Sequence, residues 1–260
     1  MSDMTIKTPA EIEKMRQAGR IVEEVLLLMQ QIARPGVSTA ELDAAAADFI
    51  KSRGAVASFL HYRGYPASIC ASVNEQVVHG IPGGRRLVSG DILSVDVGAY
   101  LDGWHGDAAR TYFIGDVAPE VQRLVRVTRQ CFYEGLRFAR PGCRVGDISA
   151  AIQTYAESHG YGVVRELVGH GIGRNMHEPP DVPNFGSGGR GLRLKAGMTI
   201  AIEPMINLGT AAVRVLADGW TVVTKDGLPS AHYENTVAIT DGEPLLLTKS
   251  QEEHGPEVGE

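Results

Sequence analysis

The chain has 260 residues, an apolar content of 43% and a formal net charge of −6. An acidic chain of ordinary composition can bury a core, but it lacks the basic face of nucleic-acid-binding proteins, so we expect no nucleic-acid partner. Its three cysteines are too few for a disulfide framework, and no stretch is apolar enough for a signal peptide or a membrane span, which together predict a cytoplasmic protein with reduced thiols.

Two helices are predicted at the start of the chain. A capping box spans Thr8–Glu11, and apolar residues at helical spacing follow it up to a Pro35-Gly36 stop. A second capping box, Ser38–Glu41, opens a helix that we expect to end at Gly54. Because the next stretches are rich in β-branched and aromatic residues, we expect short strands at 56–61, 69–73, 92–100 and 108–114.

The helical pattern starts again in the second part of the chain. A helix is predicted from Pro119 to a stop at Pro141-Gly142. Aligned without gaps, residues 140–160 match residues 34–54 at the Arg-Pro-Gly start, at two alanines and at the closing glycine. The match predicts a second copy of the first helix pair.

A second match at almost the same offset involves two carboxylates. The nine residues from Gly90, GDILSVDVG, lie over the nine from Gly197, GMTIAIEPM, so that Asp96 lies over Glu203. Chance could produce the helix match alone, but it explains the carboxylate match less easily.

The two matches indicate one α+β domain made of two related halves, each a helix pair on antiparallel strands. The halves would face each other across a pseudo-twofold axis, and a site between them would receive acids from both. We expect one domain over residues 1–260, with halves at about 8–116 and 117–249 and a disordered tail at 250–260.

The hairpin between residues 95 and 111 is the strongest candidate for part of that site. Asp96 and Asp107 flank an Asp102-Gly103 turn, which is a strong hairpin signal. A tight turn pairs residue 96 with 109, and a looser loop would set the aspartates directly opposite; either register points both carboxylates the same way. Partly buried like charges repel unless a cation lies between them, so the hairpin favours a metal site over a solvated ribbon.

Three further residues extend this pair into a set of candidate ligands. His170 lies between two glycines, Glu203 belongs to the matched strand, and Glu234 stands just before an apolar strand. With Asp96 and Asp107 they make four carboxylates and one imidazole, which suit manganese, iron or cobalt better than a zinc–thiolate site. Two such ions can share a hydroxide and polarise a carbonyl together, as in aminopeptidases. For each acid alone, a solvated surface role is the alternative.

The other histidines fall into two groups. His79 and His177 lie in glycine- and proline-rich loops, where catalytic side chains commonly lie, although a hydrogen-bonded structural role is the alternative. We expect structural or surface roles for the rest, which are His61, His105, His159, His232 and His254. From the residues alone, core packing is also the simpler interpretation of Tyr62, Tyr65, Cys70 and Trp220.

Six longer motifs are spread over nearly the whole chain, namely TPAEIEKMRQAGRIV, NEQVVHGIP, GDILSVDVGAYLDGWHGDAARTY, GHGIGRNMHEPP, AIEPM and YENT. Together they resemble the type I methionine aminopeptidases of bacteria. The resemblance implies a pita-bread fold and removal of the N-terminal methionine from nascent chains whose second residue is small. It also implies two divalent ions (Co²⁺, Mn²⁺ or Fe²⁺), with Asp107 contacting both, held by Asp96, Asp107, His170, Glu203 and Glu234.

The same resemblance implies roles for residues around the ions. Glu203 would be the general base for the metal-bound water, while His79 and His177 would hold the substrate amide and the developing oxyanion. Asn74 and Ser230 match positions that can hold a structural monovalent cation in relatives. The pocket for the methionine side chain would be lined by Phe59, Tyr62, Tyr65, Cys70, Met176 and Trp220.

Three residues depart from the family pattern. Phe59 stands where relatives often have a smaller residue, and Met176 stands where phenylalanine is common, which puts the shape of the pocket in doubt. Asn235 follows Glu234 where histidine is frequent, which affects the surroundings of that ligand.

Other functions within and outside this family are the alternatives. Proline-directed peptidases have a very similar ligand set but usually an additional N-terminal domain, whereas the first capping box here is at residue 8. Type II methionine aminopeptidases carry an insertion in the second half, but here His170, Glu203 and Glu234 are spaced too tightly for one. A non-catalytic pita-bread module that binds proteins would have lost metal ligands, whereas this chain keeps all five. We expect a monomer, and the resemblance leaves the cellular metal and any association with the ribosome open.

Overall fold

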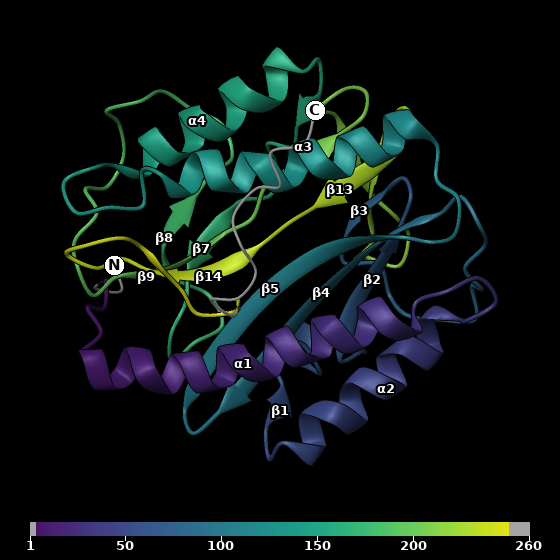
Figure 1. Cartoon of the computed structure of the whole chain (residues 1–260), viewed down its shortest axis with the longest axis horizontal. Coiled ribbons are helices and arrows are strands. Elements are labelled where there is room, and N and C mark those ends of the chain that lie inside the picture. The colour runs from purple at the N-terminus through teal and green to yellow at the C-terminus, as the bar shows by residue number, and fades with distance from the viewer. Residues whose placement is uncertain (1–3, 250–260) are drawn as a thin grey trace.

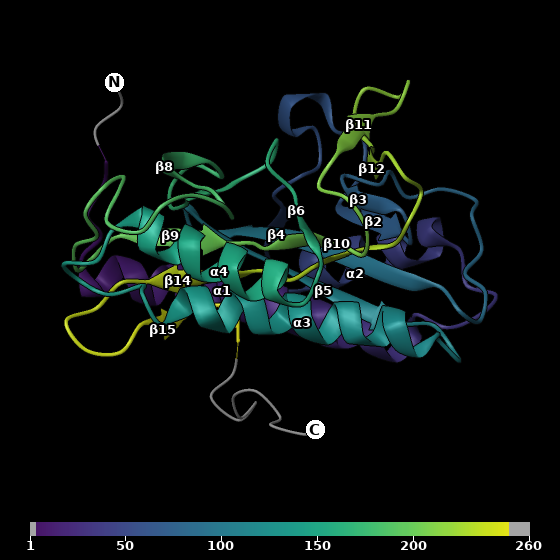
Figure 2. The same ribbon diagram turned by 90° about the horizontal axis from the view of Figure 1, so that it is seen from above.

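Antiparallel strands form the middle of the structure, and the α-helices lie on one side of them (Figures 1 and 2). The computed structural model describes residues 4–249. The first part contains α1 (Pro9–Ile32), α2 (Thr39–Ser52), β1 (Val56–Ala57), the 3-10 helix η1 (Tyr62–Gly64), β2 (Ile69–Val73), β3 (Gln76–Val78), β4 (Ile92–Leu101) and β5 (Trp104–Phe113). The second contains α3 (Pro119–Leu136), α4 (Val145–Ser158), β6 (Gly162–Val163), β7 (Gly169–Gly171), β8 (Glu178–Val182), β9 (Thr199–Ile202), β10 (Met205–Asn207), β11 (Val213–Val215), β12 (Val222–Thr224), β13 (Ser230–His232), β14 (Asn235–Ala238) and β15 (Leu245–Leu246).

Both N-terminal helices begin at their predicted capping boxes. The backbone N–H of Thr8 donates to the Glu11 carboxylate at 2.9 Å, and the N–H of Glu11 donates back to the Thr8 hydroxyl. Ser38 and Glu41 make the same reciprocal pair, with the first bond at 2.7 Å. Each pair satisfies two of the backbone donors that a helix start leaves open, which explains why the helices start there. Among the residues that the structure describes, no helix is both long and apolar enough to cross a membrane.

The prediction of a strand at 56–61 is wrong beyond Ala57. After Ser58 the chain stops pairing with β4 and forms a short turn, in which His61 and Arg63 adopt positive φ angles of 66° and 50°. Such left-handed residues interrupt a strand. The short strand β3 was not predicted either, because its partner β12 lies far away in the sequence.

The β4–β5 hairpin has the tight register predicted from the sequence. Asp96 lies opposite Ala109, and Gly98 lies opposite Asp107. The two turn residues, Asp102-Gly103, have φ angles of 49° and 87°, as a two-residue turn with left-handed central positions requires. The aspartates are therefore diagonal neighbours on one face of the ribbon.

The second part of the chain reproduces several local features of the first. Helices α2 and α4 both have 14 residues. Before them, Gly36 and Gly142 share a φ angle of 93°, and their N–H groups donate to the carbonyls of Leu87 and Leu194. Strands β4 and β9 begin two residues after the matched glycines at 90 and 197, which both have positive φ angles. These correspondences support the interpretation of two related halves.

Each half also buries a core of its own. One core contains Leu42 of α2 and Leu93 of β4, and the other contains Phe132 of α3 and Ile148 of α4. A third cluster contains residues of both halves, including Met15, Tyr65, Cys70, Trp104, Ile172 and Met176.

The halves are joined by backbone hydrogen bonds between β5 and the segment before β14. The N–H of Glu234 donates to the carbonyl of Ala109 at 3.0 Å, and the N–H of Ala109 donates to the carbonyl of Glu234 at 3.4 Å. One residue further along β5, the side chain of Arg110 donates to the same Glu234 carbonyl. We call this contact the seam, and it places the candidate ligands of one half beside those of the other.

Glycine is required where α1 crosses the strands. A Cβ on Gly19 would collide with the carbonyl oxygen of Leu247, and a Cβ on Gly106 of β5 would lie 2.8 Å from the backbone of Gly19. Neither neighbour is a flexible side-chain end, so the helix and the strands could pack this closely only without these methyl groups.

We therefore expect Gly19→Ala to destabilise the fold by about 1–3 kcal/mol, as other overpacking substitutions do. This loss exceeds the gain of about 1 kcal/mol that alanine brings to a helix. Thermal denaturation measures it. Gly84→Ala is the control, because a Cβ at that position meets nothing within 4 Å, and an equal effect of both substitutions would contradict the packing argument.

Candidate metal centre

The five candidate ligands come from both halves and line one pocket beside the seam. Asp96 and Asp107 project from the β4–β5 hairpin, and His170 from β7. Glu203 directly follows β9, and Glu234 lies between β13 and β14. The sequence-predicted ligands are therefore all brought together.

Three of them already have the spacing of a metal site. Ligand atoms of Asp107, His170 and Glu234 lie within 4.8 Å of one another. The fourth residue, Glu203, places Oε1 3.7 Å from His170 Nε2. Distances of this size allow oxygen and nitrogen atoms to converge on a cation between them.

Several oxygen atoms in this pocket are buried without a hydrogen-bond partner among the described residues. They are Asp96 Oδ1, Asp107 Oδ1 and Glu234 Oε1. A buried carboxylate oxygen without a partner is costly, whereas a divalent cation satisfies it. The donor set, mostly carboxylate with one imidazole, fits manganese, iron or cobalt.

The acids of the cluster have raised pKa values. Burial raises the pKa of Asp107 to about 7 and that of Glu203 to about 8. Burial, and then repulsion by the neighbouring acids, raises the pKa of Asp96 and of Glu234 well above the usual range. The four groups can be ionised together at neutral pH only if positive charge lies among them.

His170 presents a lone pair to the carboxylates. Its Nδ1 lies 2.8 Å from the carbonyl oxygen of Gly171, which can only accept, so Nδ1 carries the proton. The unprotonated Nε2 then lies 3.6 Å from Asp107 Oδ2. A backbone carbonyl that fixes the tautomer in this way is typical of metal-ligating histidines.

Comparison with known proteins decides the family. Residues 13–241 match the metallopeptidase family M24. A methionine aminopeptidase of Clostridium acetobutylicum is 55% identical over 244 residues, which cover 94% of this chain and 98% of that protein. The chain belongs to metallopeptidase family M24.

Solved structures agree with this assignment. The methionine aminopeptidase of Rickettsia prowazekii superposes with a TM-score of 0.94 at 43% identity, over 95% of this chain and all of that one. A prolidase of Pyrococcus furiosus superposes with a TM-score of 0.76 at 22% identity, which shows a shared fold only, and the chain covers 66% of it. The predicted pita-bread fold and the resemblance to bacterial methionine aminopeptidases are confirmed, and the chain is a metallopeptidase.

A cavity of about 150 Å³ adjoins the ligands of this M24 enzyme. Tyr65 and Trp220 meet edge to face in its wall, with ring centroids 5.1 Å apart. The Tyr65 hydroxyl is held by the carbonyls of Ile69 and Gly80, so the ring cannot move aside freely. The other predicted pocket residues line the same cavity, namely Phe59, Tyr62, Cys70 and Met176.

His79 and His177 lie at the same cavity. Burial lowers the pKa of both rings, and that of His177 falls to about 3. His177 Nδ1 lies 2.8 Å from the Tyr62 hydroxyl, and the two rings are stacked. Neutral rings of this kind offer one hydrogen-bond donor each.

The structure adds residues that sequence reasoning missed. His232, expected to be structural or on the surface, is buried with Nε2 3.8 Å from Glu203 Oε2. It lies two residues before Glu234, a spacing that puts alternate strand residues on one face and could have indicated it. Arg110 donates to the carbonyl of Glu234 at 2.6 Å and to Asn235 Oδ1 at 2.8 Å.

The positions matched to a monovalent cation are neighbours. The N–H of Ser230 donates to the carbonyl of Asn74 at 2.9 Å, and the Asn74 side chain binds Asp91 and the N–H of Ile92. The cation itself stays a prediction. His254 and the tail at 250–260 lie outside the described residues.

Metal binding should release protons at neutral pH. With pKa values of about 7 for Asp107 and about 8 for Glu203, the metal-free cluster is partly protonated at pH 7, and a cation must displace these protons. The affinity for Mn²⁺ should therefore rise from about pH 6 to about pH 8, by up to about tenfold per pH unit for each proton displaced.

Isothermal titration calorimetry in buffers of different ionisation enthalpy measures both the affinity and the number of protons released. Glu203→Gln is the matched comparison and should release fewer protons, because one titrating carboxylate is gone. An Mn²⁺ affinity that stays constant over this pH range would contradict the protonated cluster.

Proposed function

We propose that this M24 enzyme removes the N-terminal methionine from peptides and nascent proteins whose second residue is small. The observation that carries the proposal is the cavity, which is lined both by aromatic, thiol and thioether side chains and by the candidate ligands. Such a space admits one apolar side chain and holds its peptide bond beside the acids. The proposal includes action as a cytoplasmic monomer on chains that leave the ribosome.

The proposed cofactor is a pair of divalent ions, with manganese, cobalt and iron as the candidates. Asp96, Asp107, His170, Glu203 and Glu234 would hold them, with Asp107 shared. When bound, such ions would polarise the peptide carbonyl and lower the pKa of water. The unpartnered oxygens and the raised pKa values of the acids support this assignment.

The protein side chains would move and hold protons. Glu203 would accept a proton from the attacking water at a carboxylate oxygen and pass it to the leaving amine. The Tyr62 hydroxyl would donate to Nδ1 of His177, which leaves the proton on Nε2 to bind the oxygen where negative charge develops. His79, whose ring meets that of Trp220 in the cavity lining and whose pKa is lowered by burial, would hold the substrate amide.

Specificity follows from the cavity walls. An apolar slot discriminates against one missing or extra methylene by only about 1–3 kcal/mol, so norleucine should replace methionine, while leucine, branched one carbon too early, should be cleaved poorly. Lysine and glutamate should not be cleaved, because burying their charge without a partner is costly. Phe59 fills space near Gly98, where a Cβ would lie 3.0 Å from its ring, so Phe59→Cys should widen the slot.

A panel of Met-X-Ser peptides with Mn²⁺-loaded protein tests the function. We expect cleavage for X = Gly, Ala, Ser, Thr, Cys, Pro or Val. Equal kcat/KM for X = Ala and X = Lys would refute the requirement for a small second residue. Faster release of alanine from Ala-Pro-Ala than of methionine from Met-Ala-Ser would instead assign the chain to the proline-directed branch of the fold.

The role of His177 can be separated from metal binding. If it acts on substrate, His177→Ala should keep the metal content of the purified protein but lower kcat by on the order of 10²–10³, the effect of losing one transition-state donor. His159→Ala, directly after α4 and away from the pocket, is the control and should change neither. A fall to one ion per chain would show that His177 is a ligand.

A further inference from the structure

The loop between β7 and β8 carries two residues of the cavity. Residues 172–177, which we call the β7–β8 loop, belong to no helix or strand, yet Met176 and His177 both line the cavity. His177 Nδ1 lies 2.8 Å from the Tyr62 hydroxyl, and its ring centroid lies 4.1 Å from that of His170. A side chain that must meet one atom of a substrate needs a backbone held to within about 0.5 Å. The contacts that hold this loop therefore bear on what His177 can do.

A buried ion pair lies directly beside His177. Lys7 Nζ donates to Glu178 Oε2 at 2.7 Å, and the two side chains are 4% and 7% exposed. The Thr5 hydroxyl donates to the same oxygen at 2.7 Å, while the N–H of Asn175 donates to Oε1 at 3.1 Å. One oxygen of the carboxylate therefore faces the segment before α1, and the other faces the β7–β8 loop. Glu178 links the two.

The carboxylate of this pair is charged at neutral pH. Burial acts to raise the pKa of Glu178, but the hydrogen bonds that it accepts, led by that from Lys7, outweigh burial and hold the pKa below its ordinary value. A buried ion pair is an expensive way to stabilise a fold, since the desolvation of both charges offsets much of their attraction. A role in fixing geometry explains its presence better than a role in stability.

Lys7 is itself held in place along its whole length. Its backbone N–H donates to the carbonyl of Gly197 at 2.7 Å, two residues before β9, the strand that leads to Glu203. A Cβ on Gly197 would lie 2.8 Å from the Lys7 carbonyl oxygen, and a Cβ on Gly173 would lie 2.6 Å from Lys7 Cε. Lys7 thus forms a tightly packed spacer between the strand of a candidate ligand and the loop that carries His177.

The β7–β8 loop is anchored separately at its other end. The N–H of His105 donates to the carbonyl of Gly173 at 2.9 Å. The guanidinium of Arg174 lies over the Trp104 ring, 4.3 Å from its centre. Both contacts come from the β4–β5 hairpin and fix the start of the loop, so the position of its end depends on Glu178.

We propose that Lys7 is a positioning residue that holds His177 in the cavity through Glu178, an inference that rests on the proposed function of His177. Without the ammonium group, the Glu178 carboxylate is a buried charge that faces no cation. It then turns towards water and moves the adjoining His177 with it. The candidate metal ligands lie on other segments and keep their positions, so loss of Lys7 impairs the chemical step rather than metal binding.

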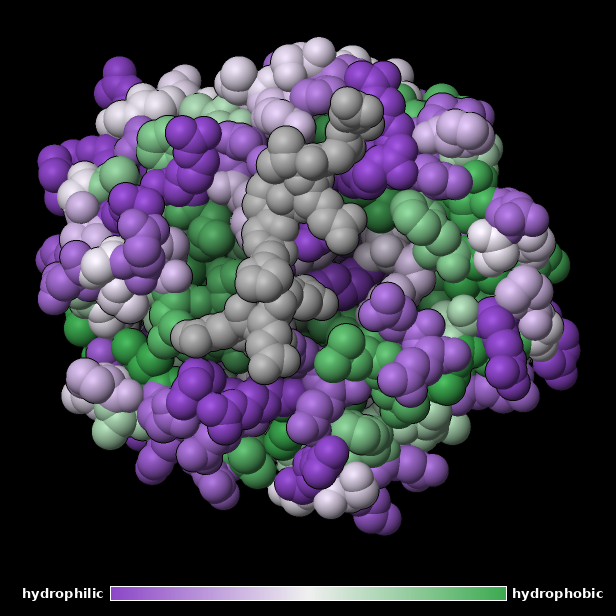
Figure 3. Space-filling view, viewed as in Figure 1, coloured by the Kyte–Doolittle hydropathy of each residue, from purple (hydrophilic) through white to green (hydrophobic). Residues whose placement is uncertain are grey.

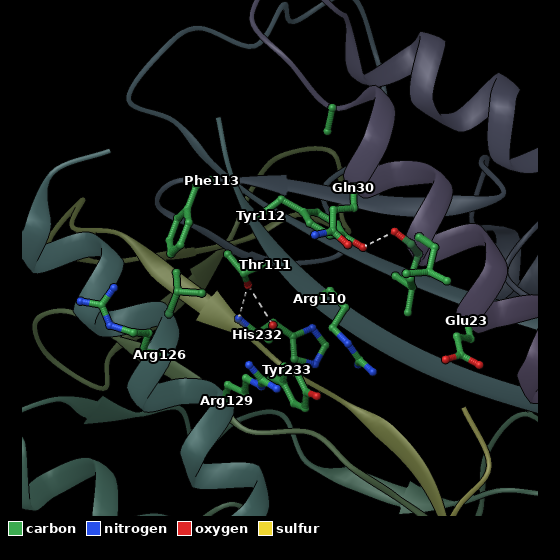
Figure 4. A pocket seen from close by; sticks show the side chains of 14 residues that line it. Glu23, Gln30, Arg110, Thr111, Tyr112, Phe113, Arg126, Arg129, His232 and Tyr233 are labelled. Atoms are coloured by element: carbon green, nitrogen blue, oxygen red, sulfur yellow. Dashed lines mark hydrogen bonds between the residues drawn. The ribbon is translucent and has the colours of Figure 1, made fainter. Parts of the chain in front are cut away.

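A residue on the other side of the strands supplies a matched control. Helices α1 and α3 lie on the face seen in Figure 3, where strongly hydrophilic residues are scattered, and a pocket of about 530 Å³ lies between them (Figure 4). Arg126 of α3 lines this pocket, and its guanidinium donates to Gln122 one turn earlier. None of the described residues that line it belongs to the β7–β8 loop. Arg126→Met therefore removes the same charge as Lys7→Met at a place remote from His177.

The position of His177 can be measured with neither metal nor substrate. In the full-length chain labelled with ¹⁵N-histidine, the imidazole signals of His177 are those that His177→Ala removes. Lys7→Met should shift them towards those of a free imidazole, because the ring leaves Tyr62, whereas Arg126→Met should leave them unchanged. Glu178→Gln keeps the shape of its side chain but not the charge, so it should act as Lys7→Met does and replaces that variant if it fails to fold. Unchanged His177 signals would overturn the proposal.

Kinetics with Met-Ala-Ser and Mn²⁺-loaded protein give the second measurement. Lys7→Met should lower kcat by about tenfold or more and leave KM and the Mn²⁺ content within about twofold, because a displaced His177 binds the developing oxyanion poorly. In the His177→Ala background the same substitution should change kcat by less than about twofold, because residues that act through one another are not additive.

The two measurements separate the possible failures. Equal losses of kcat in both backgrounds would overturn the proposal, because Lys7 would then act on the fold as a whole. A wild-type chain that releases no methionine would instead refute the proposed function, and the imidazole signals would still decide whether Lys7 holds His177 in place.

Discussion

The cluster of four carboxylates at the seam, two of them buried and two partly buried, is the constraint on which the rest of the structure depends. Burial raises the pKa of each acid, and Asp96, Asp107 and Glu234 keep oxygen atoms that none of the described residues 4–249 binds. A globular protein rarely retains such an arrangement for stability, because apolar residues of similar size would pack there at lower cost. The fold therefore holds these groups for the charge that they can bind, and its remaining polar contacts serve to fix them.

The fixing contacts come from both halves. The Thr236 hydroxyl donates to the carbonyl of Asp107 and accepts from its N–H, at 2.9 and 3.1 Å, so β14 of the second half sets the position of a ligand in the first. In return Arg110 of the first half binds the backbone of Glu234 in the second. Because these bonds are buried or partly buried and join the two halves, a shift of one half relative to the other would disturb ligands in both. Rigid positioning of this kind is what a site needs to hold a peptide bond within reach of its acids.

Much of this arrangement could be predicted because it depends on local signals. A capping box involves residues three apart, so the starts of the first two helices follow from neighbouring residues. The Asp102-Gly103 turn fixes the register of the whole hairpin, so the diagonal placement of the two aspartates follows from neighbouring residues as well. The strand predicted at 56–61 failed because His61 and Arg63 adopt left-handed conformations that their side chains do not require. The burial of His232 beside Glu203 depends mainly on packing between distant strands, which its two-residue spacing from Glu234 indicates only in part.

The match between Asp96 and Glu203 bears on how such a centre could arise. If the two halves descend from one duplicated gene, an ancestor of half the length would have paired with a second copy of itself, and the axis would have placed two identical carboxylates face to face. A cation held there would have joined the copies before any reaction was catalysed. The ligands without a counterpart in this match, which include Asp107 and His170, would then record the later loss of symmetry, since attack on a peptide bond needs one side of the site to differ from the other.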